Sequence, residues 1–212
     1  MWYTDGAAVF NSSNLSVWPL ILTINELPFS ERYKKGNILV PAIWCGPVKP
    51  HVYILLKPVY PDLLKVKKGI PINVFKKVEN IVRGIIIVGT ADLRARALML
   101  NLVAHNGECG CQKCFQPGEG RVGCPLVRVF PFQPNNMASR NDKHFAKDGL
   151  YATSLRKAYM GVKGPTLLSQ LSLFPIRGTG LDEMHMIFGG CGKTLAKLIL
   201  SEEKKKPSVQ HF

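Results

Sequence analysis

The chain has 212 residues, of which 46% are hydrophobic and 20% charged, a composition that indicates a globular rather than a disordered protein. No apolar run approaches the roughly 18 residues that a membrane-spanning helix needs, so we expect no membrane partner. The first residues have neither the basic head nor the apolar core of a secretory signal. We therefore expect a nuclear or cytoplasmic protein that is not secreted.

The charge is strongly positive, because 28 Lys and Arg stand against 14 Asp and Glu and give a net charge of +14. Such an excess is typical of proteins that bind polyanions, since each neutralised phosphate releases a counterion. A basic surface that serves solubility alone is the competing interpretation. The side chains that we expect to contact nucleic acid are Lys65, Lys67, Lys68, Arg94 and Arg96.

The first half of the chain predicts short strands followed by helices. We expect a strand over 2–10 with a turn at Asp5-Gly6, an edge strand over 17–24 because it contains Pro19, and a strand over 37–44. A kinked helical region over 52–68 and one or two strands over 70–82 follow. The apolar run 85–88 predicts a fully buried strand, and the spacing of apolar residues predicts a helix over 93–104.

The composition then changes. Residues 105–140 are rich in Cys, Gly and Pro and have no hydrophobic core of their own, so they predict an insertion that needs a staple. Residues 178–180 predict a turn, and a helix over 182–200 is broken near 189–190. We divide the chain into 1–104 as the first part of a core, 105–140 as the insertion, 141–200 as the helical remainder and 201–212 as a charged tail.

Two carboxylates follow predicted strands. Asp5 ends the first strand, and Asp92 follows the apolar run 85–88. Carboxylates from two neighbouring strand ends can bind Mg²⁺ or Mn²⁺, which take oxygen ligands. Turn chemistry at Asp5 and helix capping by Asp92 are the competing explanations.

Cysteine and histidine provide two further patterns. Cys111 and Cys114 have the spacing of half a tetrahedral zinc site. Cys109 and Cys124 could complete it, or the remaining ligands could come from His144, His185, Cys191 or His211; free thiols are the alternative. Asp182 and His185 are three residues apart and so share one helix face, as in second-shell or phosphate-contacting pairs.

In their order these segments resemble a DNA transposase of the CACTA (En/Spm) type, transposase family tnp2. The segments that match the family are Tyr3-Thr-Asp-Gly6, Ile43-Trp-Cys-Gly46, Asp92-Leu-Arg-Ala-Arg96, Asn106-Gly-Glu-Cys-Gly-Cys-Gln-Lys-Cys114 and Asp182-x-x-His185. The resemblance implies a ribonuclease H-like mixed sheet with β-β-β-α-β-α order and a Cys-rich insertion. It also implies metal-dependent DNA cleavage and strand transfer, with Asp5 and Asp92 as two members of an acidic triad and Cys111 and Cys114 as a zinc pair.

The third acid of that family lies in a Trp-Lys-x-x-Glu context, which is missing here. We therefore expect a transposase-derived fragment of the catalytic core that binds nucleic acid but is catalytically incomplete. An active nuclease that uses Glu202 or Glu203 is one alternative. A zinc-stapled protein-interaction module without nucleic-acid binding is another. Whether the chain forms a homo-oligomer is left open.

Overall fold

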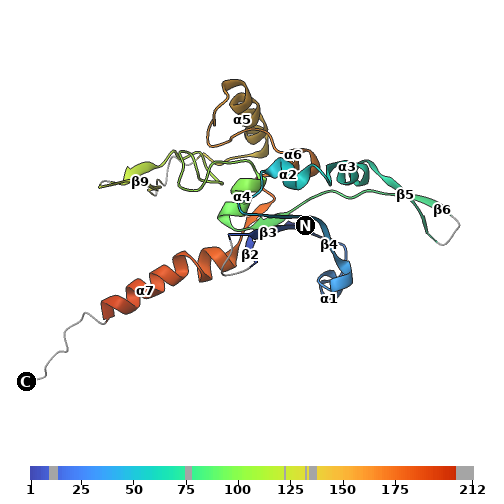
Figure 1. The fold of residues 1–212 in the computed structure, drawn as a ribbon, viewed down its shortest axis with the longest axis horizontal. Helices are drawn as coiled ribbons and strands as arrows, with labels where there is room; N and C mark the ends of the chain where they lie inside the picture. Colours follow the sequence, from blue (N-terminus) through green and yellow to red (C-terminus); the bar gives the residue numbers. More distant parts are fainter. Residues whose placement is uncertain (10–13, 75–77, 122, 132, 134–137, 204–212) are drawn as a thin grey trace, which may run out of the picture. The chain divides into compact units, whose positions relative to one another are not determined.

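Figure 1 shows the fold in a computed structural model of the chain. The structure describes residues 1–212 except 10–13, 75–77, 122, 132, 134–137 and 204–212. The side chains of residues 74, 78, 79, 121, 124–126, 202 and 203 also lie outside the description. The chain divides into two compact units, Met1–Gly180 and Leu181–Phe212. Among the described helices, none has the length and apolar character needed to cross a lipid bilayer.

A mixed sheet is the framework of the first unit. Its strands are β1 (Trp2–Tyr3), β2 (Ala7–Ala8), β3 (Ser16–Thr23), β4 (Ile38–Gly46), β7 (Gly89–Ala91) and β10 (Thr179–Leu181). Their order is β10-β7-β1-β3-β2, and β4 also pairs with β3. β1, β2 and β4 are antiparallel to β3, whereas β1 and β7 are parallel. The expected α/β class with a mixed sheet is confirmed.

Helices and two hairpins complete the chain. The helices of the first unit are α1 (Phe29–Arg32), η1 (Lys35–Asn37), α2 (Val52–Leu56), α3 (Tyr60–Lys68), α4 (Leu93–Met99), α5 (Asp142–Leu155) and α6 (Leu168–Leu171). The hairpins are β5 (Ile70–Val74) with β6 (Val78–Val82) and β8 (Glu119–Arg121) with β9 (Cys124–Val129). The second unit contains the π-helix η2 (Met184–Phe188) and α7 (Cys191–Glu203), so the expected break at 189–190 is confirmed.

The core of the first unit is built from apolar side chains that the strands and helices share. Trp2 of β1, Leu20 of β3, Leu55 of α2, Met99 of α4 and Phe145 of α5 are all at least 98% buried in one cluster. Burying a side chain of this size stabilises a fold by about 1.5–3 kcal/mol. This shared core thus anchors β1, which precedes Asp5, and α4, which follows Asp92.

The prediction that residues 17–24 form an edge strand is wrong, because β3 pairs with β4 on one side and with β1 and β2 on the other. The pairing of Tyr3 with Ile21 and of Ala7 with Val17 places Pro19 opposite Asp5. The ladder on this side of β3 is interrupted there, because β1 ends at Tyr3 and β2 begins at Ala7. Proline lacks an N–H, and at this position the ladder requires none.

The prediction of a fully buried strand over 85–88 is also wrong. Ile85 and Ile87 are each 43% exposed, and Ile86 forms only an isolated parallel bridge with Ser172. The strand begins at Gly89, because residues 89–91 lie between β1 and β10 in the sheet. The apolar run 85–88 therefore precedes the buried strand β7 and is not part of it.

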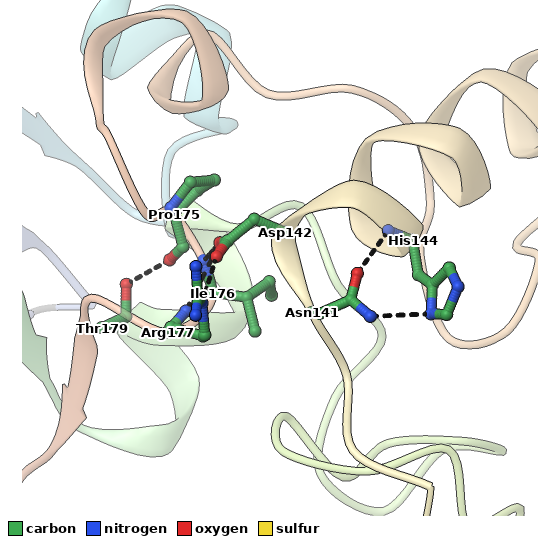
Figure 2. Close-up of polar contacts among 7 residues, drawn as sticks. All are labelled: Asn141, Asp142, His144, Pro175, Ile176, Arg177 and Thr179. Carbon is green, nitrogen blue, oxygen red and sulfur yellow. Dashed lines mark hydrogen bonds and ion pairs between the residues drawn. The ribbon is translucent and has the colours of Figure 1, made fainter.

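The prediction of a turn over 178–180 is wrong for Thr179 and Gly180, which belong to β10; of the three residues, Gly178 alone lies in the turn before the strand. The Gly89 N–H donates to the Gly178 carbonyl over 2.9 Å, which joins this segment to β7. Figure 2 shows how the start of α5 holds the same segment: the Asp142 carboxylate accepts from the Ile176 N–H (2.7 Å) and from Arg177 Nε (2.9 Å). A charged group on α5 therefore fixes the chain as it enters β10.

Gly89 is required where β7 begins. A Cβ atom at this position would lie 1.9 Å from Cε2 of Trp2, whose side chain is 1% exposed. Since Trp2 is paired directly with Gly89 across the parallel ladder, neither partner can move aside without breaking that pairing.

We expect Gly89→Ala to lower the free energy of unfolding by about 1–3 kcal/mol or more, because overpacking beside a buried tryptophan forces the strands apart. Urea denaturation measures this effect. Gly36→Ala is the matched control, since a Cβ at Gly36 meets no atom within 4 Å. Equal losses in the two variants would contradict the close approach of Trp2 to Gly89.

Candidate functional site

Asp5 and Asp92 follow two neighbouring parallel strands. The β1–β7 pairing joins Trp2 to Gly89 and Tyr3 to Thr90. Asp5 follows two residues after the end of β1, and Asp92 follows directly after the end of β7. Neighbouring strands of a sheet lie about 4.8 Å apart. The register therefore brings the two carboxylate-bearing residues to one edge of the sheet, where ligands of α/β proteins commonly bind.

Asp92 caps α4. Its Oδ1 atom accepts a hydrogen bond from the Ala95 N–H over 2.6 Å, which satisfies one of the free donors of the first helical turn. Within the described residues Oδ2 accepts no hydrogen bond. The cap and the metal-ligand interpretations are thus compatible, because one oxygen serves the helix and the other is available.

Asp5 is held by local contacts. Its Oδ1 atom accepts from the Gly6 N–H over 2.7 Å, and its Oδ2 atom accepts from the Tyr3 hydroxyl over 3.4 Å. Gly6 must be glycine, since a Cβ atom there would lie 2.4 Å from Cζ2 of Trp18. This turn, opposite the proline of β3, holds the carboxylate of Asp5 in a half-buried position.

Among the described residues, no three His, Cys, Asp or Glu side chains are grouped so that they could hold a metal ion. In the second unit, Asp182 Oδ2 contacts His185 Nδ1 at 2.8 Å, so the structure brings this expected pair together. Burial by itself would raise the pKa of Asp182, but hydrogen bonds from His185 and from the Met184 amide hold that pKa below its ordinary value.

The loop around Cys111 and Cys114 lies beside the start of α4. Gln112 Nε2 donates to the Leu93 carbonyl over 2.9 Å, one residue after Asp92. Lys113 Nζ donates to the Thr179 carbonyl of β10 over 2.9 Å. The side chains between the two cysteines therefore tie the loop to α4, which follows β7 in the chain, and to β10, which pairs with β7. No pattern in the sequence predicts these two contacts.

The thiols of this loop differ in their surroundings. Burial by itself would raise the pKa of Cys111, but hydrogen bonds from the Lys113 amide (3.4 Å) and from Cys114, with the charge of Arg140, lower it. Burial raises the pKa of Cys114 and that of Cys109, whose Sγ donates to the Phe115 carbonyl over 3.7 Å. The side chain of Cys124 lies outside the described residues.

Arg140 holds the same loop through hydrogen bonds, and sequence reasoning did not identify this residue. It is 4% exposed, donates from Nε to the Cys111 carbonyl (2.9 Å) and from Nη2 to the Cys109 carbonyl (2.7 Å), and stacks over Phe115. Its Nη1 atom is buried without a hydrogen-bond partner in the described part of the chain. Nothing in the spacing of the sequence distinguishes Arg140 from a surface arginine.

Arg96 differs from the expectation that it lies on an exposed basic face, because it is only 1% exposed. The apolar face of α4 carries it into the interior, where burial lowers its pKa and the thiol of Cys111 acts in the opposite direction. In the described residues neither Arg96 nor Arg140 forms an ion pair with a carboxylate; Asp148 and the thiols act on Arg140 from farther away.

The remaining basic candidates lie at the surface. Arg94 is exposed on the first turn of α4, and Lys65 and Lys68 are exposed in the last turn of α3. Lys65 forms a 3.2 Å ion pair with Asp62, and half-buried Lys67 donates to the Gln170 carbonyl. The ammonium group of Lys68 and the guanidinium group of Arg94 have no partner among the described residues.

Comparison of the chain with protein-family models, with curated proteins and with solved structures found no match. The functional interpretation therefore depends on the residues and their geometry.

Two substitutions at Asp92 separate capping from metal binding. We expect Asp92→Ala to lower the free energy of unfolding by about 0.5–2 kcal/mol, whereas Asp92→Asn retains a good cap and most of that stability. If Asp92 is a metal ligand, Mn²⁺ should stabilise the parent protein and neither variant, because alanine and asparagine lack the charge. Thermal unfolding with and without Mn²⁺ measures both effects. A full Mn²⁺ effect in Asp92→Asn would show that this carboxylate is no ligand.

Proposed function

We propose that the chain is a transposase-derived catalytic-core segment of the CACTA type that binds nucleic acid and is catalytically incomplete. The observation that carries this proposal is the parallel pairing of β1 with β7, because Asp5 and Asp92 follow the same ends of these two neighbouring strands. Paired carboxylates at this place are suited to divalent metal ions in phosphoryl transfer.

The sheet order supports a ribonuclease H-like core. Three antiparallel segments come first in the chain: β1 with β2, then β3, then β4. β7 then adds parallel to β1 before α4 begins. This agrees with the β-β-β-α-β-α order that the resemblance implies, with α2 and α3 between the antiparallel segments and β7. The β5–β6 hairpin is an addition to that order.

Asp5 and Asp92 would hold Mg²⁺ or Mn²⁺ in this proposal. The free Oδ2 atom of Asp92 fits such a role, and Asp5 offers two oxygens that are only singly hydrogen-bonded. When bound, the ion would activate a nucleophile and stabilise a leaving group at phosphorus. The residues of the chain contribute position: the Tyr3 hydroxyl and the Gly6 amide orient one carboxylate, and the α4 cap orients the other.

Incomplete catalysis is part of the proposal because two carboxylates do not hold two metal ions well. No third acidic ligand joins Asp5 and Asp92 among the described residues. An active nuclease that uses Glu202 or Glu203 is the competing function, and the side chains of both lie outside the described residues. Nuclear or cytoplasmic location follows from the proposed nucleic-acid partner.

Zinc bound by Cys111 and Cys114 fits the charges around them. Arg96 and Arg140 are buried and unpaired with carboxylate, and each has a nitrogen without a hydrogen-bond partner in the described residues. Buried charges normally have a compensating partner. Metal-bound thiolates carry negative charge and would supply it. Cys109 and Cys124 are the candidates for the remaining ligands.

We expect DNA affinity to fall about tenfold or more between roughly 50 and 200 mM salt, because several phosphate contacts release counterions. Replacing Lys65 and Lys68 by Gln should weaken binding and lower the salt slope by about one for each lost phosphate contact. Fluorescence anisotropy with a labelled duplex measures both quantities.

Lys143→Gln with Lys147→Gln is the matched control for that experiment, since it removes the same charge from exposed positions on α5. This control should leave the salt slope near that of the parent. A flat salt response in the parent would favour the third candidate, a zinc-stapled protein-interaction module that does not bind nucleic acid.

Cys111→Ser should reduce the zinc content of the purified protein to a small fraction of the parent value, since one thiolate ligand is lost. Cys45→Ser is the control, because Cys45 is exposed and does not belong to the loop. Elemental analysis by mass spectrometry gives the zinc per chain. The same zinc content in Cys111→Ser and in the parent would exclude a site at this pair.

A further inference from the structure

The exposed side of α5 carries apolar side chains. Phe145 and Ala152 bury the opposite side of the helix in the core. Leu150, Tyr151 and Leu155, which we call the α5 patch, are 67%, 47% and 53% exposed. Tyr151 and Leu155 are four residues apart and therefore neighbours on the helix surface, and Leu150 belongs to the same turn as Tyr151. Apolar residues that gather in this way, instead of being scattered singly, mark a contact surface.

Cationic side chains border the α5 patch at both ends. Lys143, Lys147 and Tyr151 follow one another at intervals of four residues, which places the two lysines on the ridge of the helix that leads to the patch. Arg156 and Lys157 follow the last helical turn. All four cations are exposed, and none of them forms an ion pair within the described residues.

The two carboxylates of α5 do not neutralise these cations. Asp142 accepts hydrogen bonds from the Ile176 N–H and from Arg177, as Figure 2 shows. Asp148 is buried together with the core side of the helix. The exposed face of α5 therefore combines apolar contact area with positive charge that no exposed carboxylate of this helix offsets.

Tyr151, at the centre of this face, is held by its neighbours. The Lys147 ammonium lies over its ring at 5.6 Å from the centroid, and the ring of Tyr159 lies at 5.5 Å between centroids. A tyrosine held in place loses little conformational entropy when a partner binds, and exposed tyrosines of this kind are common anchors in protein interfaces.

We propose that the exposed face of α5 binds an acidic amphipathic helix of a partner protein. Its carboxylates pair with Lys143 and Lys147, and its apolar side chains cover the α5 patch. A second copy of this chain is a poor partner, because two chains of net charge +14 repel each other. Nucleic acid is also a poor partner for this face, since its interfaces are more polar and would leave Leu150 and Leu155 without apolar neighbours.

A synthetic peptide tests the proposal. It consists of two repeats of Glu-Leu-Leu-Glu-Ala-Leu-Glu, so it matches the 14 residues of α5 in length. As a helix it carries leucines on one face and carboxylates on the rest. The same peptide with Gln in place of every Glu is the uncharged counterpart. Fluorescence anisotropy of the labelled peptides with the full chain at about 50 mM salt should show about tenfold tighter binding of the Glu peptide.

Charge variants locate the lysine contacts. Lys143→Gln with Lys147→Gln should weaken binding of the Glu peptide about fivefold and leave that of the Gln peptide near the parent value, because only the charged peptide loses partners. Lys65→Gln with Lys68→Gln is the matched control. It removes the same charge from exposed positions on α3 and should leave both affinities at the parent value.

Apolar variants locate the other half of the contact. Leu150→Gln with Leu155→Gln should weaken binding of both peptides about tenfold, since apolar contact serves both. Leu195→Gln with Leu198→Gln is the matched control, because these leucines of α7 are 59% and 57% exposed. Circular dichroism of each variant reports whether the fold is intact.

Three results would overturn the proposal. Absence of binding, or equal affinities of the Glu and Gln peptides, would remove the role of the lysines. Parent-like affinities in the α5 variants would place binding elsewhere. Weaker duplex DNA binding by Lys143→Gln with Lys147→Gln, without loss of peptide affinity, would assign the face to nucleic acid. The peptide measurements involve neither DNA nor metal, so their failure is distinguishable from failure of the proposed function.

Discussion

The parallel pairing of β1 with β7 is the contact on which the candidate site depends. These strands are separated by more than eighty residues, and their register is fixed where Trp2 lies over Gly89. A shift of one residue would turn the side chains of β1 to the other face of the sheet. The chain that leads from β1 to Asp5 would then be displaced relative to β7 and Asp92. A packing interaction in the core thus determines the geometry of two polar groups at the edge of the sheet.

The surroundings of the pair follow from the same arrangement. Pro19 lies opposite Asp5 in the antiparallel register, so the chain can leave the ladder there without losing a hydrogen bond from β3. On the other side, Gln112 and Lys113 attach the cysteine loop to α4 and β10. The loop that carries the proposed zinc pair is therefore attached to the first turn of α4, whose N-cap is Asp92.

Sequence patterns predicted local structure well where a single element determines them. The antiparallel strands, the α4 cap at Asp92 and the break before α7 follow from turn residues, capping chemistry and glycine. Two kinds of prediction went wrong because they depend on tertiary neighbours: whether β3 is central, and whether residues 85–88 are buried. The interior position of Arg96 and the part of Arg140 in the cysteine loop could not be predicted, because one sequence does not reveal which arginines the fold encloses.

The most direct test of the account is nicking of supercoiled plasmid by the purified chain with Mn²⁺, measured alongside DNA retention on a filter. The account predicts that the parent, Asp5→Asn and Asp92→Asn all retain DNA and that none nicks it above background. Nicking by the parent that disappears in both variants would contradict catalytic incompleteness and show that a third ligand completes the site. Failure of the parent to retain DNA would contradict the nucleic-acid-binding function itself.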